Sequence, residues 1–259
     1  MIFDPAALNA LAAPLLATAA IFARVGAMMF LVPGFGEAAI PMRIRLAAAI
    51  SFSLVLAPLL PSTPGIASLD PVQIAEFLIT EAAIGCGFGL LLRLFVMALQ
   101  TAGTIAAQST SLSQIFGGTA GADPQPAMGH LLTWAALAFA VASGLHLRLI
   151  TFLARTYDIF PAGSTPSSSV ATPFVVERIA QSFALAFSIA APFLIASMLY
   201  NVTLGVINRA MPQLMVSFVG APAITAGGLA LLMVLSPAII HLWHDSLTRF
   251  MLAPAEAGF

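Results

Sequence analysis

Residues 204–222 read LGVINRAMPQLMVSFVGAP, which places Asn208, Arg209 and Gln213 inside a long apolar run with Pro212 among them. The flanking sequence carries no other Asp, Glu, Lys or Arg for many turns of helix. A charged side chain in the middle of a bilayer costs roughly 2.5–3.5 kcal/mol even on a lenient scale, so it normally faces protein or water. Proline removes a backbone donor and bends or ends a helix. The stretch therefore predicts a broken or bent membrane element whose polar side chains face inward.

The composition is that of an integral membrane protein. Hydrophobic residues make up 60% of the 259 residues and charged residues only 7%, whereas a soluble globular chain carries about 25% charged residues. The formal net charge of −1 offers no electrostatic basis for binding nucleic acid. The single cysteine, Cys86, excludes a disulfide within the chain and a cysteine-based zinc site.

Turn signals divide the chain into about six predicted spans. They are residues 8–32, 46–60, 71–117, 128–150, 174–208 and 213–250. The third segment contains no strong helix breaker. About 45 helical residues would measure roughly 67 Å, which exceeds a hydrocarbon core of roughly 30 Å. The segment is therefore either two spans or one helix that extends beyond the lipid. Within it, Gly85, Gly87 and Gly89 predict close contact with another helix. We expect an all-α integral membrane fold of about six long, partly broken hydrophobic helices arranged as helical hairpins, in a single membrane domain over residues 1–259.

Two groups of titratable residues admit more than one interpretation. His241, His244 and Asp245 share one helix face and could bind a metal; alternatively they form a polar helix end at the membrane interface beside Trp243. The structural interpretation is favoured, because no further ligand on another helix is identifiable.

Glu76 and Glu81 could relay protons in a transporter or pair with an arginine of a neighbouring helix. Pairing is favoured because charges within a membrane usually have a partner. The chain contains no H-E-x-x-H, no G-x-S-x-G and no phosphate-binding loop. The sequence therefore predicts no catalytic residue, no metal and no cofactor.

Residues 109–126, STSLSQIFGGTAGADPQP, form a predicted loop rich in Gly, Pro and small polar residues. Ile115 and Phe116 give it an apolar tip. A flexible loop with such a tip between two membrane helices can occlude a pore, and a simple surface turn explains the composition equally well.

Taken together, these motifs resemble the FliR family, the export-gate subunit of bacterial flagellar type III secretion, over nearly the whole chain. One motif joins Arg24 to PGFG at 33–36 and PMRIRL at 41–46. A second comprises Glu81, Gly85 and Gly89, then TAG at 101–103, Gln108 and DP at 123–124. The third and most specific comprises Gly205, NRAMPQ at 208–213, Gly220 and Pro222.

The resemblance implies a non-enzymatic subunit of a heteromeric ring in the bacterial inner membrane, within the flagellar basal body. Its expected partners are FliP-like, FliQ-like and FlhB-like subunits, unfolded export substrates and membrane lipid, with no nucleic acid. The helices are multi-pass or partly raised above the bilayer. The family's pore plug is carried over to the loop residues Ser113, Ile115, Phe116, Gly117 and Gly118.

The matching motifs imply a set of structural or assembly residues, whose arginines would pair with acids on neighbouring helices or subunits. This set is Arg24, Pro33, Gly34, Pro41, Arg43, Arg45, Glu81, Arg93, Asn208, Arg209, Pro212 and Gln213. The equivalent subunit of a virulence type III injectisome shares much of the pattern and stays open. A different class, a secondary transporter for a small solute, would use a helix broken at Pro212 with the carboxylates Glu76 and Glu81. An intramembrane metalloenzyme centred on His241 and His244 is a third possibility.

Overall fold

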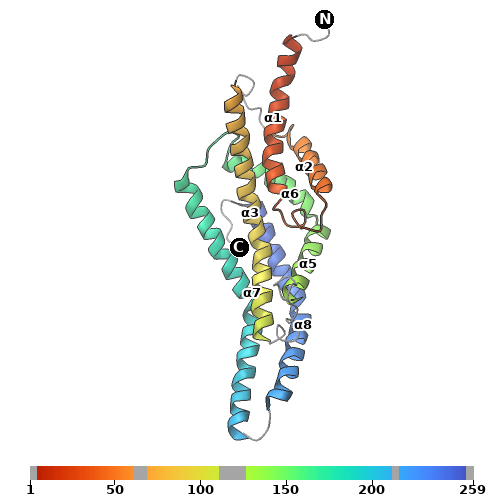
Figure 1. The fold of residues 1–259 in the computed structure, drawn as a ribbon, viewed down its shortest axis with the longest axis vertical. Helices are drawn as coiled ribbons and strands as arrows, with labels where there is room; N and C mark the ends of the chain where they lie inside the picture. Colours follow the sequence, from red (N-terminus) through yellow and green to blue (C-terminus); the bar gives the residue numbers. More distant parts are fainter. Residues whose placement is uncertain (1–4, 61–68, 111–126, 212–215, 255–259) are drawn as a thin grey trace. The chain divides into compact units, whose positions relative to one another are not determined.

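A computed structural model describes residues 5–60, 69–110, 127–211 and 216–254. Every regular element among these residues is an α-helix (Figure 1). The helices are α1 (Pro5–Met29), α2 (Met42–Leu56), α3 (Pro71–Ser109), α5 (Ala127–Ala142), α6 (Leu145–Ile159), α7 (Ser168–Ala210) and α8 (Val216–Leu252). The all-α prediction is confirmed.

Four described helices are long and apolar enough to cross a membrane, or five if the bent pair α5 and α6 is one span. The four segments are Ala12–Met29, Pro71–Ser109, Ala171–Ala210 and Pro222–Leu252. This is fewer than the six expected because α2, with 15 residues, measures only about 22 Å at 1.5 Å per residue. The predicted span 128–150 is interrupted at Gly144, whose φ of 84° is left-handed and ends α5.

Helix α3 settles the question posed by the third predicted segment. It is one continuous helix of 39 residues, about 58 Å long, which exceeds the roughly 30 Å hydrocarbon core. The two-span alternative is therefore wrong for the described helix, and its extension beyond the lipid stays a prediction that its length supports.

The chain divides into two compact units. The first contains Met1–Leu94, Val141–Ile179 and Thr248–Gly258, and the second contains Phe95–Ala140 and Ala180–Leu247. Each is described by itself below. The single membrane domain expected over residues 1–259 stays a prediction.

In the first unit, α1 packs against α3 through glycines that leave no room for a side chain. A Cβ added at Gly85 would lie 2.0 Å from the carbonyl oxygen of Arg24, and one added at Gly89 would lie 3.0 Å from Leu31 Cβ. Gly87 points to open space, because alternate residues of a helix lie on different faces. The expected close contact is confirmed at Gly85 and Gly89.

Helix α1 also packs against α2, as expected of a helical hairpin. The turn between them uses Gly34 at a φ of 86° and Gly36, where a Cβ would lie 2.6 Å from the carbonyl oxygen of Phe30. Phe35 of the turn meets Phe52 of α2 edge to face, with ring centroids 6.0 Å apart. The glycines thus allow a reversal too tight for other residues.

The second unit contains the C-terminal parts of α3 and α7 and most of α5 and α8. Here α3 and α5 touch backbone to backbone, since a Cβ at Gly103 would lie 2.3 Å from Gly129 Cα. Within this unit α7 and α8 run antiparallel as a hairpin (Figure 1). The Tyr200 hydroxyl of α7 donates a hydrogen bond to the Gly220 carbonyl of α8 and ties the two helices together.

Trp243, beside His241, His244 and Asp245, lies inside the second unit, and its position at the membrane interface stays a prediction. Its side chain is fully buried, and the indole Nε1 donates a 2.8 Å hydrogen bond to the carbonyl oxygen of Phe95. A buried tryptophan needs a partner for its single N–H, and Phe95 on α3 supplies it.

Candidate functional site

The best-defined polar site of the first unit is an ion pair between α1 and α3. Arg24 Nε lies 2.7 Å from Glu81 Oε2, and Arg24 Nη2 lies 3.1 Å from Glu81 Oε1. Both side chains are fully buried. A bidentate guanidinium–carboxylate pair is the geometry that best offsets the cost of removing two charges from water. The pair is positioned by Gly85, one turn after Glu81, because its missing side chain lets the backbone of α1 at Arg24 approach α3.

The end of α6 completes this cluster. Arg24 Nη1 donates to the carbonyl oxygens of Phe160 at 3.0 Å and Thr156 at 3.3 Å, and to Thr156 Oγ1 at 3.4 Å. Its guanidinium carbon also lies 3.7 Å above the centre of the Tyr157 ring. The last carbonyls of a helix lack partners within the helix and carry partial negative charge, so a buried cation there satisfies and stabilises them.

Glu81 has a second role in the same cluster. Its Oε1 accepts a 2.9 Å hydrogen bond from the backbone N–H of Gly163, in the connection between α6 and α7. Gly163 has a φ of 77°, and a Cβ there would lie 2.4 Å from the Phe77 ring. We refer to Arg24, Glu81, Thr156, Tyr157, Phe160 and Gly163 as the Arg24 cluster. It joins α1, α3, α6 and the start of the connection to α7 at one point.

The cluster was only partly foreseeable. Charge counting favours an arginine partner for Glu81, and Arg24 is that partner. The contributions of Thr156, Phe160 and Gly163 were missed, because all three act through backbone atoms that every residue possesses. Pro161 and Gly163, in a stretch rich in Ser, Thr and Pro, were the signals in the sequence for the turn.

A second group of the expected assembly residues surrounds the turn after α1. Arg93 of α3 forms an ion pair with Glu37 at 2.5 Å, and Arg45 of α2 donates to the Glu37 carbonyl oxygen. The side chains of Arg93 and Glu37 are only partly buried. Their ion pair is therefore screened by solvent and contributes less to stability than the contacts of the Arg24 cluster. Glu37 thereby ties α2 and α3 to the same turn.

Three more of the expected residues lie around this turn. Pro33 is buried, Gly34 supplies the left-handed backbone and Pro41 precedes the first residue of α2. Pro41 has a φ of −58°, which suits a helix start. Arg43 is exposed and forms no ion pair with the described residues.

The stretch around Pro212 differs from its prediction. Asn208 and Arg209 lie in the last turn of α7 and are exposed rather than facing inward. Arg209 is favourably placed at the negative end of the helix dipole. No described element covers this end of α7, which explains the exposure. Pro212 and Gln213 lie outside the described residues, as do the plug residues Ser113, Ile115, Phe116, Gly117 and Gly118.

The alternative sites receive little support from the geometry. Glu76 is exposed near the start of α3, and Glu81 is engaged with Arg24, so the two carboxylates do not form a common relay. His241 and His244 both meet the ring of Phe139 edge to face, with centroids 5.0 Å away. Over the described part of the chain, no group of three or more possible metal ligands lies together.

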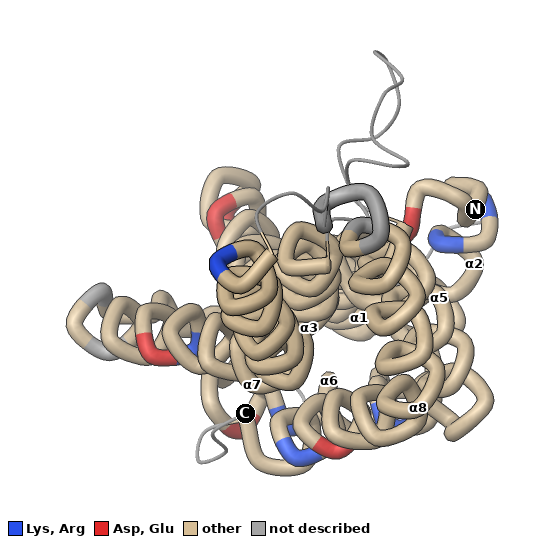
Figure 2. Tube along the Cα trace, turned by 90° about the horizontal axis from the view of Figure 1, so that it is seen from below, with Lys and Arg blue, Asp and Glu red and all other residues tan. Residues whose placement is uncertain are grey.

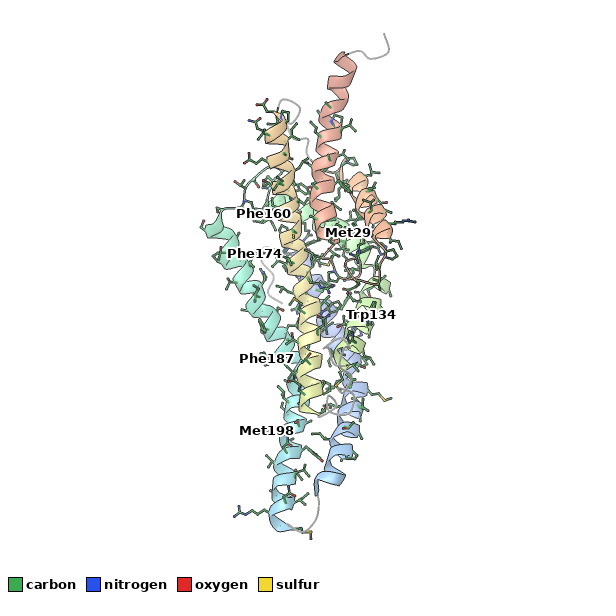
Figure 3. The ribbon with its side chains drawn as sticks, viewed as in Figure 1. Met29, Trp134, Phe160, Phe174, Phe187 and Met198 are labelled. Carbon is green, nitrogen blue, oxygen red and sulfur yellow. The ribbon has the colours of Figure 1, made fainter. Side chains whose placement is uncertain are left out.

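The hairpin of α7 and α8 exposes a long apolar surface. Charged residues are sparse along the chain, and nearly all of the tube in Figure 2 is tan. Phe187 and Met198 stand out from α7 in Figure 3 and are 56% and 70% exposed. Other large exposed apolar side chains on the hairpin include Phe183, Ile195, Leu199, Val202, Val206, Leu229, Met233 and Val234. A surface of this extent is one that lipid or partner proteins cover.

Comparison with known proteins matches the sequence of this chain to one family. The family model for bacterial export proteins, family 1, matches residues 15–250. The flagellar biosynthetic protein FliR of Caulobacter vibrioides is 35% identical over 228 residues, covering 88% of this chain and 91% of that protein. FliR of Escherichia coli is 27% identical over 83% of this chain and 82% of its own length, and FliR of Aquifex aeolicus is 27% identical over 83% of each. The match extends over all the described helices, from within α1 to the end of α8, and the chain therefore belongs to the FliR family of bacterial flagellar export proteins.

Proposed function

We propose that this chain is a subunit of the export gate of the flagellar type III secretion apparatus in the bacterial inner membrane. The observation that carries the proposal is the family match over residues 15–250, on a chain whose described helices are long and apolar. Matched relatives carry the flagellar name, which favours the flagellar system over a virulence injectisome. The subunit lies in a heteromeric complex and acts without catalysing a reaction.

The proposal extends to partners and to a plug. The chain joins FliP-like and FliQ-like subunits in a ring, with a FlhB-like subunit beside it, and unfolded flagellar proteins pass through the assembled channel. The exposed apolar surface of α7 and α8 supports this, because it needs a cover that the chain by itself does not provide. In this assembly Ser113, Ile115, Phe116, Gly117 and Gly118 form the plug.

The assembly is tested by the native mass of the tagged chain, co-expressed with FliP-like and FliQ-like subunits and purified in detergent. The chain expressed without partners serves as the control. We expect one copy of it inside a large membrane complex of defined mass. A stable monomer or homodimer, indifferent to those partners, would overturn the export-gate function and favour the secondary transporter.

The plug is tested separately by deleting residues 115–121. Removal of the plug should let K⁺ leak from vesicles that contain the assembled complex. A deleted complex of normal mass and unchanged K⁺ permeability would remove the plug assignment and leave the assembly standing.

A further inference from the structure

The end of α3 is held by both helices of the α7–α8 hairpin, and all of these residues lie within the second unit (Figure 1). Ser197 Oγ of α7 donates a 2.6 Å hydrogen bond to the carbonyl oxygen of Ser109, the last residue of α3. Asn201 Nδ2, one turn further along α7, donates to Ser197 Oγ at 3.3 Å. The final carbonyls of a helix have no partner within it, so this side-chain donor supplies one for the Ser109 carbonyl.

The next residue, Thr110, fits against a glycine of α8. A Cβ added at Gly228 would lie 2.7 Å from Thr110 Cγ2 and 2.8 Å from Thr110 Cβ, closer than real Cβ atoms approach. Thr110 cannot turn away freely, because its Oγ1 donates a 2.9 Å hydrogen bond back to the Ala106 carbonyl. Thr110 is 2% exposed. Only glycine at position 228 accommodates Thr110 where it lies.

We propose that Ser197 and Gly228 are positioning residues that fix the point at which the chain leaves α3 for the plug loop. The residues of this α3-end seat are Ser109, Thr110, Ser197, Asn201 and Gly228. The inference rests on the proposed plug function, since the seat matters to the channel only if the loop that follows closes it. Two independent contacts, one a hydrogen bond from α7 and one a close fit on α8, hold successive residues at the root of that loop.

The chain supplies a matched control at the adjacent position. Gly227 is exposed, and a Cβ there meets nothing within 4 Å. Gly227→Ala and Gly228→Ala therefore add the same methyl group to the same helix, one residue apart, and only the second displaces Thr110. In Gly228→Ala, the further change Thr110→Gly removes the three Thr110 atoms that lie nearest the new Cβ, namely Cγ2, Cβ and Oγ1.

The test measures K⁺ efflux from vesicles containing the purified complex of this chain with its FliP-like and FliQ-like partners. We expect Gly228→Ala to raise the rate of efflux several-fold toward that of the 115–121 deletion, and Gly227→Ala to leave it at the wild-type level. Adding Thr110→Gly to Gly228→Ala should restore a closed channel. Leakage from Gly227→Ala as well, or no rescue by Thr110→Gly, would overturn the inference.

Failure of the seat and failure of the plug give different results. If the deletion leaks and Gly228→Ala does not, the plug stands and the seat does not position it. If the deletion itself does not leak, the plug function falls and the inference falls with it.

Should Gly228→Ala prevent assembly, Ser197→Ala decides the question, because it removes one hydroxyl and adds no volume. Its control is Ser188→Ala, since the Ser188 hydroxyl is exposed and donates to the Ala184 carbonyl of its own helix, with no bond to another described helix. Leakage from Ser197→Ala alone supports the seat. The inference would be overturned if Ser197→Ala and Ser188→Ala both showed wild-type K⁺ efflux while the 115–121 deletion leaked.

Discussion

At the scale of single residues, Arg24 and Glu81 depend on each other. Each is fully buried, and each directs its remaining hydrogen-bonding capacity at backbone atoms around the end of α6. Removing one partner leaves the other as an uncompensated buried charge. Replacing both with apolar side chains leaves no buried charge, so the desolvation cost disappears together with the ion pair. The pair therefore fixes how three elements meet and is weak evidence of stability in itself.

Replacing Arg24 by alanine should destabilise the protein by about 3–5 kcal/mol, because Glu81 is left buried and charged. The measurement is thermal unfolding of the purified complex, with Arg43→Ala as the control, since Arg43 is exposed and forms no ion pair with the described residues. Arg24→Met combined with Glu81→Leu should be less damaging than Arg24→Ala alone. A double variant worse than the single one would contradict the dependence of the two charges.

At the scale of elements, the packing of α1 on α3 is decided by which helix face each glycine occupies. Gly85 meets the backbone of α1, and Gly87 meets nothing within 4 Å. Both occur in the same apolar run, so the sequence predicts a close contact without telling the two glycines apart. The distinction depends on the rotation of α3, which the Arg24–Glu81 pair fixes one turn earlier.

Alanine at these two glycines should have opposite effects. Gly87→Ala should stabilise α3 by about 0.8–1.0 kcal/mol, the difference in helix propensity, since the new methyl group enters open space. Gly85→Ala should destabilise by at least about 1–3 kcal/mol, because the methyl group would overlap the Arg24 carbonyl and force α1 away. The midpoint of thermal unfolding reports both. Equal shifts for the two variants would refute the close contact at Gly85.

Element boundaries show where sequence reasoning succeeds. The hairpin of α1 and α2 is predictable from local sequence. The backbone preferences of Pro and Gly at 33–36 indicate a turn, and Pro41 indicates the start of a helix. The break at Gly144 is not, since a lone glycine in an apolar run also fits a continuous helix. The burial of Trp243 depends on a carbonyl acceptor 148 residues away, and no local pattern reports such a partner.

At the scale of the whole molecule, the unpaired surfaces indicate assembly. Arg209 is exposed at the end of α7 and forms no ion pair with any residue in the described ranges, yet it lies in the family's most specific motif. The motif was found from sequence, and the inward-facing geometry assigned to it was wrong for the chain by itself. An acid on a partner subunit is the pairing that we propose for Arg209.

Arg209→Ala should therefore lower the yield of the complex and leave the chain's own helicity unchanged. The comparison is the recovered complex mass and the circular dichroism of the chain expressed alone, with Arg43→Ala as an exposed-arginine control. Normal complex yield from Arg209→Ala would remove the proposed pairing. Loss of helicity would instead show that Arg209 acts within the chain.

The Arg24–Glu81 pair also bears on how the protein is made. The two residues are 57 positions apart, so during synthesis α1 is complete well before Glu81 leaves the ribosome. Through that interval Arg24 lacks the carboxylate that it pairs with in the folded chain, and an unpaired arginine at mid-bilayer would cost roughly 2.5–3.5 kcal/mol. We therefore expect α1 to reach its final, buried position only after α3 has emerged and Glu81 can neutralise Arg24.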